Sequence, residues 1–492
     1  MAPIKYLKTE TANLYGDETS NKVITELLWG DRIEILSTTV TDGRVKAKAR
    51  GKYGFIKESV YGEEPLLELY LIDVGQGDGI LIVTPDREHI LLDGGYNRSV
   101  QPHKKSAADF VDWKFKKDYG LDKIDLDVMI ASHCDADHYG GLWDLFNPAE
   151  KLNIDCSSVS LKNFYHAGVS WWKSASNSRF LGSKDNGYLN ELIEGKDSVQ
   201  KGLDPSSALK FQGNWATFMQ CILNSGANIK RISYNPDKGF EYLPGFEQDK
   251  KTAIKILGPI EQTISGKSKL KDFGSDSQNT NGNSVLLRVD YGRAKILLTG
   301  DLNKKSEQYI LDKMSGNRLE LSADVAKSCH HGSDDCSYEF MECIQASANV
   351  ISSGDDEAHS HPRPNIVATC GITGYRIIQD DEVLTPLIYS TEISRSYKLG
   401  DPYKIECKDY PVGSQTINVR LEDKAKTNIY YKQRSSGALN ASDKFKNLDK
   451  IKVVDTIVYG LVNVRTDGNK ILCATLNEGK SKWEVQTFNS RF

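Results

Sequence analysis

Residues 132–141 read Ser-His-Cys-Asp-Ala-Asp-His-Tyr-Gly-Gly, and four of them carry side chains that bind metal ions: His133, Asp135, Asp137 and His138. The apolar run 126–131 comes just before and predicts a buried strand, while the residues after the glycine pair predict a helix. Ligands on such a strand-to-helix loop can converge on one point. Mixed nitrogen and oxygen donors suit divalent ions, so the loop favours a metal site over the alternative, a solvated polar turn.

Six further motifs follow a fixed order along the chain. They are Leu-Ile-Asp-Val-Gly-Gln-Gly-Asp at 71–78, Leu-Leu-Asp-Gly-Gly at 91–95, Asn-Ser-Val-Leu-Leu at 283–287, Leu-Thr-Gly-Asp at 298–301, His-His-Gly-Ser at 330–333 and His-Ser-His-Pro at 359–362. Together with the loop, they resemble the metallo-β-lactamase fold over roughly residues 66–380. With Asp135 in place of the usual histidine, the loop is similar to that of the hydrolase domain of the competence protein ComEC and its soluble relatives. The resemblance implies an α/β fold, an αββα sandwich.

The same resemblance implies a centre with two divalent metal ions. Its expected ligands are His133, Asp135, Asp137, His138, Asp301 and His330. Asp301 ends a predicted strand and is expected to bridge both ions, which holds their spacing. Asp73 and Asp93 are expected behind the ligands, where they would orient the metal loop.

His330 and His331 are adjacent, and neighbouring side chains on extended backbone point in opposite directions. Only one of the two is therefore expected to face the metals. We favour His330 as the ligand and keep His331 as a residue that transfers protons or binds substrate. Asp135 and Asp137 are alternative proton carriers.

One departure from the family pattern affects the choice of metal. The usual fold has a further histidine ligand before the bridging aspartate, but no histidine occurs between His166 and His330. Asn281, Asn283 or a water would have to take that place. An oxygen-rich site results, so Mn²⁺ becomes a plausible alternative to Zn²⁺.

His361 and Arg363 precede Pro364, a residue that suits the first position of a helix. The N-terminus of a helix favours an anion, so this segment predicts a phosphate site in which His361 also serves catalysis. Asn283 is a further expected substrate contact. The alternative for the segment is a histidine-rich surface turn.

The rest of the chain predicts two flanking regions. Residues 1–65 contain short strand-like runs and resemble bacterial SH3-like modules; they would either bind a partner or cover a sheet edge. Residues 66–384 form the predicted hydrolase domain, with an insertion at about 150–275 that shapes specificity. Residues 385–492 predict a separate β-rich domain for binding or assembly.

Composition excludes some classes of protein. The 492 residues include 63 Lys and Arg against 67 Asp and Glu. The whole chain therefore lacks the excess of basic residues that indicates nucleic-acid binding. The nine cysteines are scattered singly, which predicts reduced thiols and a cytoplasmic protein. We expect no membrane segment and no signal peptide, because no apolar run is long enough. DNA uptake, which needs a membrane channel, is therefore not expected.

Three functions remain open. The first is a metal-dependent hydrolase in which two metal ions activate a water, acting as a phosphodiesterase or nuclease on nucleic acid or nucleotides. The second is a hydrolase of small esters, lactones or lactams, which would need an apolar pocket in place of cationic phosphate contacts. The third is a regulated effector subunit of a multi-protein system, such as a defence system, that binds protein partners through the flanking β regions.

Overall fold

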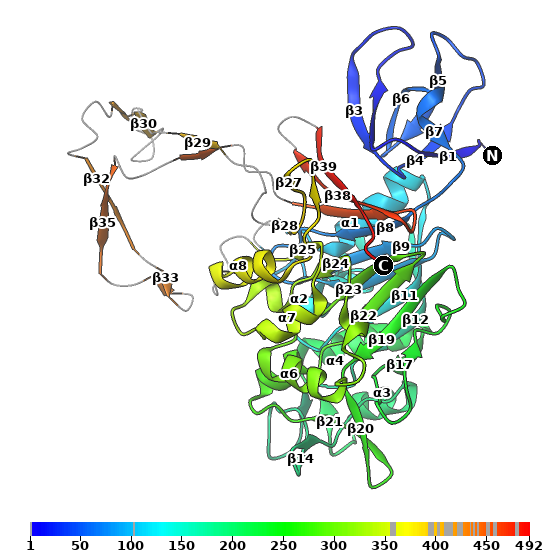
Figure 1. The fold of residues 1–492 in the computed structure, drawn as a ribbon. Coiled ribbons are helices and arrows are strands. Elements are labelled where there is room, and N and C mark those ends of the chain that lie inside the picture. Colours follow the sequence, from blue (N-terminus) through cyan, green and yellow to red (C-terminus); the bar gives the residue numbers. More distant parts are fainter. Residues whose placement is uncertain are drawn as a thin grey trace.

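Two large β-sheets face each other and carry helices on their outer sides in the computed structural model (Figure 1). The structure describes residues 2–101, 104–354, 361–391, 398–400, 404–407, 417–420, 427–432, 434–435, 438–439, 442–448, 453–455, 460–477 and 482–492. Among these residues no helix is long and apolar enough to cross a membrane.

The first sheet has nine strands. In spatial order they are β17 (Asn228–Arg231), β12 (Ser158–His166), β11 (Lys123–Ala131), β10 (His89–Gly94), β9 (Gly79–Val83), β8 (Leu67–Leu71), β37 (Val462–Thr466), β38 (Lys470–Asn477) and β39 (Lys482–Asn489). Strands β10, β11, β12 and β17 are parallel, and the rest pair antiparallel.

The second sheet has seven strands. Its order is β18 (Glu241–Tyr242), β19 (Thr252–Gly258), β22 (Leu286–Tyr291), β23 (Ala294–Leu298), β24 (Val325–Lys327), β25 (Ala348–Ile351) and β28 (Leu387–Ser390). Aliphatic side chains of both sheets, such as Ile130 and Leu298, form one buried core between them.

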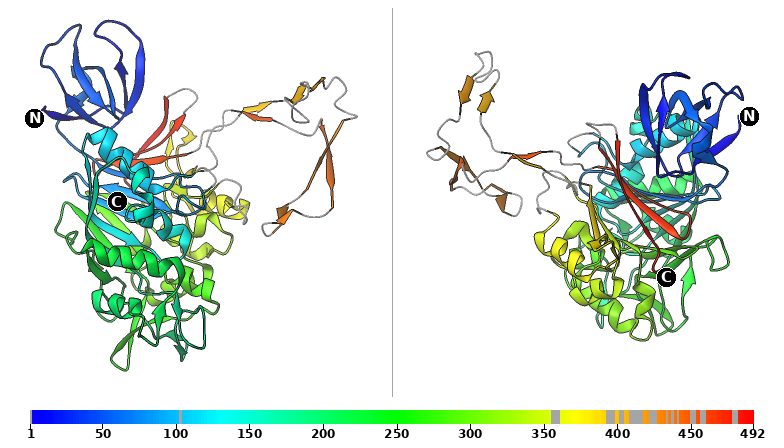
Figure 2. Two further views of the ribbon diagram at one scale, coloured as in Figure 1. Left: turned by 180° about the vertical axis from the view of Figure 1, so that it is seen from behind. Right: turned by 45° about the horizontal axis from the view of Figure 1, so that its top comes forward.

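Helices complete the sandwich on both sides. One set packs on the first sheet: α1 (Ala107–Trp113), α2 (Ala136–Asp144), α3 (Lys196–Leu203) and α4 (Gly213–Ser225). The other packs on the second sheet: α6 (Lys304–Lys313), α7 (Tyr338–Ile344) and α8 (Pro364–Thr373). Separate apolar clusters lie under the two sets. The predicted αββα architecture is confirmed, and Figure 2 shows its layers from two further sides.

The N-terminal region folds as a sheet of its own, with strands β1 (Ile4–Leu7), β2 (Thr11–Tyr15), β3 (Val23–Leu28), β4 (Arg32–Ile35), β5 (Arg44–Ala49), β6 (Lys52–Lys57) and β7 (Tyr61–Gly62). It docks on the C-terminal strands, where the fully buried Arg465 Nη1 lies 2.8 Å from Asp31 Oδ1. Trp483 and Leu472 pack against Leu28 there. The likeness to SH3 modules stays a prediction.

Two predicted boundaries differ from the structure. Residues 150–275 contribute β12, β17 and β19 to the two central sheets, so much of this stretch is core and not an insertion. Residues 385–492 likewise contribute β28 and β37–β39. The partner of β37 is β8, almost four hundred positions earlier, and a sequence pattern does not reveal so distant a pairing.

Shorter strands form small ribbons. Those within the body are β13 (Trp172–Lys173) with β16 (Lys210–Phe211); β14 (Lys184–Asp185), β15 (Tyr188–Leu189), β21 (Lys267–Lys271) and β20 (Glu261–Ile264); and β26 (Ile378–Gln379) with β27 (Glu382–Val383). Eight more extend away from the body (Figures 1 and 2), and we call these the arm: β29 (Lys398–Gly400), β30 (Lys404–Cys407), β31 (Ile417–Arg420), β32 (Asn428–Tyr431), β33 (Arg434–Ser435), β34 (Ala438–Leu439), β35 (Lys444–Asn447) and β36 (Val453–Asp455).

Candidate metal centre

The candidate centre lies where strands from both sheets end. The metal loop connects β11 to α2, and Asp301 follows β23. Two glycines let α2 approach the sheet closely, because a Cβ on Gly141 would lie 1.9 Å from Gly94 O. A Cβ on Gly140 would lie 2.3 Å from Asn97 N. The Gly140-Gly141 pair thus allows α2, the helix that carries ligands, to pack closely on the sheet.

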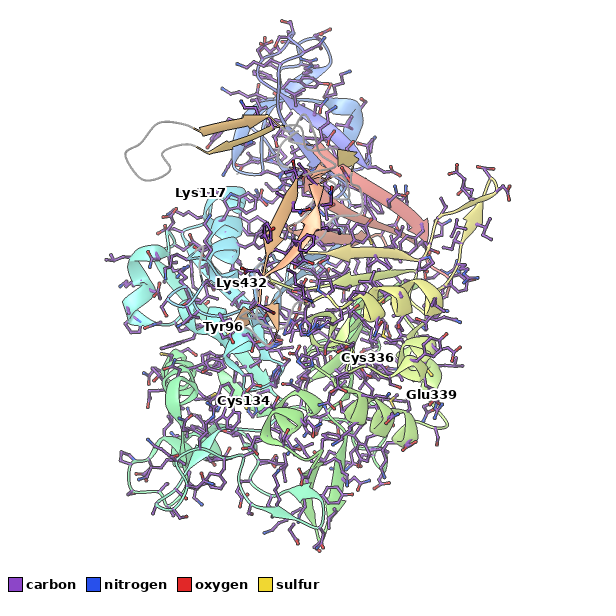
Figure 3. All side chains as sticks on the ribbon, turned by 90° about the vertical axis from the view of Figure 1, so that its left-hand side faces the viewer. Tyr96, Lys117, Cys134, Cys336, Glu339 and Lys432 are labelled. Atoms are coloured by element: carbon purple, nitrogen blue, oxygen red, sulfur yellow. The ribbon has the colours of Figure 1, made fainter. Side chains whose placement is uncertain are left out.

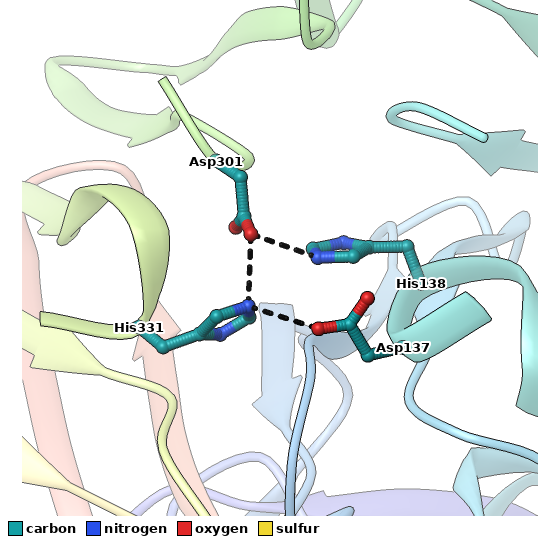
Figure 4. A group of neighbouring side chains, drawn as sticks. All are labelled: Asp137, His138, Asp301 and His331. Atoms are coloured by element: carbon teal, nitrogen blue, oxygen red, sulfur yellow. Dashed lines mark ion pairs between the residues drawn. The ribbon is translucent and has the colours of Figure 1, made fainter. Parts of the chain in front are cut away.

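Four side chains converge on one point: Asp137, His138, Asp301 and His331 (Figure 4). Each offers a ligand atom, and these atoms all lie within 4.8 Å of one another. Asp301 Oδ2 lies 3.1 Å from His138 Nε2 and 2.9 Å from His331 Nε2. His331 Nε2 is also 3.8 Å from Asp137 Oδ2. The four come from both halves of the sandwich.

The chemistry of this donor set fits divalent metal ions. Nε2 of His133, of His138 and of His331 are buried, and among the described residues none makes a hydrogen bond of good geometry, although His138 and His331 face Asp301 as ion pairs. Buried polar atoms are normally satisfied, so three such nitrogens beside a buried carboxylate fit a divalent cation. His133 lies against His138, with ring centroids 4.0 Å apart.

Asp93 contacts His138 at Nδ1, the ring nitrogen that faces away from Asp301, in the orienting position expected from the sequence. Its Oδ2 lies 2.8 Å from His138 Nδ1, and its Oδ1 accepts a hydrogen bond of 2.8 Å from Ser132 N–H. This contact orients the ring so that Nε2 faces the centre. Burial disfavours the imidazolium, but the carboxylates of Asp301 and Asp93 outweigh it and raise the pKa of His138 well above its usual value.

The sequence analysis did not identify two buried charged residues that lie next to the ligands, Asp78 and Lys327. Lys327 Nζ pairs with Asp78, donates to Gly300 O at 2.7 Å and lies 3.6 Å from Asp301 Oδ1. Although burial opposes charge, Lys327 and His331 lower the pKa of Asp78 to about 2. Asp78 is the last residue of the motif at 71–78, and this position could have identified it from the sequence. Lys327 lies within a short apolar strand, and nothing in the sequence marks it as part of the centre.

Asp73, predicted behind the ligands, lies elsewhere. It is exposed, and its carboxylate accepts a 3.4 Å hydrogen bond from Gly75 N–H. Asp78 occupies the predicted place instead, because the turn at Gly75 and Gly77 carries the chain back toward the centre with positive φ at both glycines.

His331, not His330, faces the cluster. The prediction assumed extended backbone, but both residues have positive φ (46° and 54°), so side chains there do not alternate. His331 Nδ1 lies 3.1 Å from Ser352 O, which directs Nε2 at Asp301. His330 Nε2 instead lies 3.3 Å from Asn281 Nδ2 at the rim.

Asp135 lies beside the four-residue cluster. It accepts hydrogen bonds from Trp171 Nε1 at 3.0 Å and from Thr280 Oγ1 at 2.7 Å, and its Oδ2 is 3.6 Å from His133 Nε2. Trp171 therefore positions Asp135. Trp172 packs in the core against Phe211, with centroids 4.8 Å apart.

The predicted substrate residues separate into two groups. Asn283 is buried and donates to the carbonyls of Lys271 and Asn279, so it ends helix α5 (Asp276–Gly282) and lies outside the cluster. His361 lies near His330, with ring centroids 5.9 Å apart. Arg363 caps α8, which begins at Pro364 as predicted. His359 lies outside the described residues.

Comparison with known proteins agrees with this geometry. Residues 72–153 match the family model of the metallo-beta-lactamase superfamily. Over this stretch the chain is similar to the superfamily. The matched stretch includes the whole metal loop together with Asp78 and Asp93.

Two curated relatives carry names connected with competence. The chain is 29% identical over 324 residues to ComE operon protein 3 of Bacillus subtilis (strain 168), which covers 64% of this chain and 32% of that protein. It is 34% identical over 102 residues to competence protein ComA of Neisseria gonorrhoeae, covering 20% of this chain and 14% of that protein. The chain thus spans about a third or less of these relatives.

Two solved structures that match part of the chain share 11% sequence identity with it. A diphosphatase from the PhnP family covers 57% of this chain and 85% of its own, with a TM-score of 0.26. A metallo-beta-lactamase from Cronobacter sakazakii with an HARLDQ motif covers 54% of this chain and 75% of its own, with a TM-score of 0.23.

Proposed function

We propose that this metallo-beta-lactamase superfamily hydrolase is a metal-dependent phosphodiesterase that cleaves nucleic acid or nucleotides. The observation that carries the proposal is the set of three buried imidazole nitrogens that make no hydrogen bond of good geometry and gather at Asp301. A metal centre alone suits several hydrolases. His361 and Arg363, on the segment bonded to Gly332 next to His331, favour a phosphate over a neutral ester.

The metal-holding residues in this proposal are His133, Asp137, His138, Asp301 and His331. Divalent ions bound there would supply a Lewis acid for the phosphoryl oxygens and lower the pKa of an attacking water. Asp93 and Lys327 keep the ligand set in place, as their contacts to His138 and Asp301 indicate.

Asp135 is assigned to proton transfer. Its carboxylate is held by Trp171 and Thr280 at the side of the centre, so it can accept a proton without leaving its position. Asp137, which Gln76 Nε2 contacts at 3.3 Å, is the alternative.

Arg363 and His361 are assigned to the substrate phosphate. The segment is anchored beside the centre because Arg363 N–H donates to Gly332 O at 2.8 Å, next to His331. The ten-residue helix α8 starts directly after Arg363, so the positive end of its dipole lies at this segment.

The test measures metal content and activity together. Wild type and Asp137→Ala are loaded with Mn²⁺ or Zn²⁺ and assayed on bis-p-nitrophenyl phosphate, a single-stranded oligonucleotide and p-nitrophenyl acetate. We expect phosphodiester cleavage by wild type that is lost with the metal in Asp137→Ala. Arg363→Ala should lower phosphodiester cleavage and spare any ester cleavage. Ester cleavage without phosphodiester cleavage would overturn the proposal.

A further inference from the structure

The arm leaves and rejoins the body beside the candidate metal centre. Gly460 N–H donates to Thr391 O at 2.8 Å, so the two ends of this excursion are hydrogen-bonded to each other. Thr391 Oγ1 donates to Ser353 O at 2.7 Å, one residue from Ser352, whose carbonyl lies 3.1 Å from His331 Nδ1. Both ends of the arm are thereby held next to Ser352, whose carbonyl orients His331.

Strands β32 and β35 of the arm display a pair of exposed aromatic rings. Tyr430 and Phe445 stand directly opposite each other in the antiparallel register, with centroids 5.9 Å apart. Their side chains are 68% and 63% exposed. Rings of this size are usually covered in a folded protein, so an exposed pair marks an interaction surface.

Lysines lie on both faces of this ribbon. Lys432 follows Tyr430 by two positions, on the face of the rings, whereas Lys444 and Lys446 adjoin Phe445 in the sequence and lie on the opposite face; all three are exposed. The sequence extends this bias, since residues 424–452 contain eight lysines or arginines and two aspartates while the whole chain has a net charge of −4. The basic character that the global composition hides is therefore concentrated in the arm. Figure 3, viewed from the side on which the arm projects, labels Lys432 on it.

We propose that the β32–β35 ribbon binds single-stranded nucleic acid and delivers it to the metal centre. Exposed rings stack on bases only where the bases are unpaired, and lysines interact with the phosphates between them. A pair of exposed rings on a ribbon that also carries lysines suits bases better than an acyl bilayer or a protein core. This inference rests on the proposed function, because it names the substrate of the same centre.

Binding is measured by fluorescence anisotropy with a labelled oligothymidylate of about 20 nucleotides, using the full chain in EDTA so that no cleavage interferes. Tyr430→Ala/Phe445→Ala and Lys444→Glu/Lys446→Glu should each weaken binding about tenfold or more. For the lysine variant, the slope of log binding affinity against log salt concentration should also become shallower by about one. Lys444→Arg/Lys446→Arg should retain binding.

Lys250→Glu/Lys251→Glu is the matched control, because it makes the same charge change at two exposed lysines in a surface turn of the body. We expect it to bind within about twofold of wild type, since two non-contacting charges act only through the screened field. Binding that survives both arm variants, or falls equally in the control, would overturn the inference. So would arm-dependent capture of phosphatidylserine vesicles with no affinity for the oligonucleotide. Cleavage of bis-p-nitrophenyl phosphate by wild type tests the proposed function separately.

Discussion

Asp301 Oδ2 lies 2.9 Å from His331 Nε2, and this contact joins the ends of β23 and β24 at the candidate centre. His138 Nε2 reaches the same oxygen from the other sheet, at 3.1 Å. A single carboxylate thus links side chains from both halves of the sandwich.

Asp301→Asn should remove bound metal and lower phosphodiester cleavage at least about a hundredfold, because a neutral amide cannot balance the charge of the ions. Metal analysis of the purified protein, together with the rate on bis-p-nitrophenyl phosphate, measures both effects. Asp73→Asn is the control and should behave as wild type, since Asp73 lies outside the cluster. Full metal retention by Asp301→Asn would contradict the assignment.

Trp171→Phe should slow catalysis roughly tenfold to a hundredfold while metal stays bound, because it deletes only the indole donor to Asp135. Adding Thr280→Val removes the second donor and should slow cleavage further. Trp172→Phe is the matched control, as its Nε1 has no hydrogen-bond partner among the described residues. Equal rate losses in the two tryptophan variants would mean that packing, not Asp135, is responsible.

Lys327→Met should reduce the free energy of unfolding by about 3–5 kcal/mol, because it leaves the buried Asp78 carboxylate without its cation. Lys327→Met/Asp78→Asn should recover part of this loss by removing the stranded charge. Urea unfolding in EDTA measures both. Lys117→Met, which breaks the exposed pair with Asp155, should change little. A double variant less stable than the single one would count against the pairing.

Glu307 should make the protein less stable as the pH rises. It is fully buried, and burial raises its pKa from 4.5 to about 8 despite a hydrogen bond from Ser337 N–H. The folded state then holds a proton that the unfolded state releases above about pH 4.5. Glu307 therefore lowers the free energy of unfolding progressively between about pH 4.5 and 8, by at most about 1.4 kcal/mol per pH unit.

Urea unfolding of wild type and Glu307→Gln across this pH range tests the effect. The glutamine variant should show a flatter dependence and gain stability relative to wild type at the alkaline end. Glu339→Gln, at an exposed position of α7, is the control and should follow wild type. Parallel curves for Glu307→Gln and wild type would refute the buried protonated carboxyl.

Local rules predicted the parts of the fold that depend on neighbouring residues. Helix α6 begins after Asn303, a residue type that favours helix N-caps, and Asn303 Oδ1 accepts a hydrogen bond from Ser306 N–H at 3.2 Å. Pro364 opens α8 as expected. The order of the motifs then sufficed for the αββα architecture, because those at 71–78, 91–95, 298–301 and 330–333 lie at or just after the end of a core strand.

Features that depend on distant contacts or unusual backbone escaped prediction. His331, and not His330, faces the cluster because both residues adopt positive φ. Positive φ is uncommon for residues other than glycine, so the sequence does not lead one to expect it here. Lys327 reads as a surface cation in sequence, yet it is buried against Asp78 from the other sheet. Only the packing of the two sheets creates that environment.

The pairing of β8 with β37 has a consequence for synthesis on the ribosome. Residues 67–71 emerge early, but their neighbours at 462–466 are translated almost four hundred codons later. Until then the nascent chain presents an unpaired strand edge next to an apolar core, a surface prone to association with other chains. We expect chaperone demand during translation to be high, and to end when the final hairpin closes the sheet.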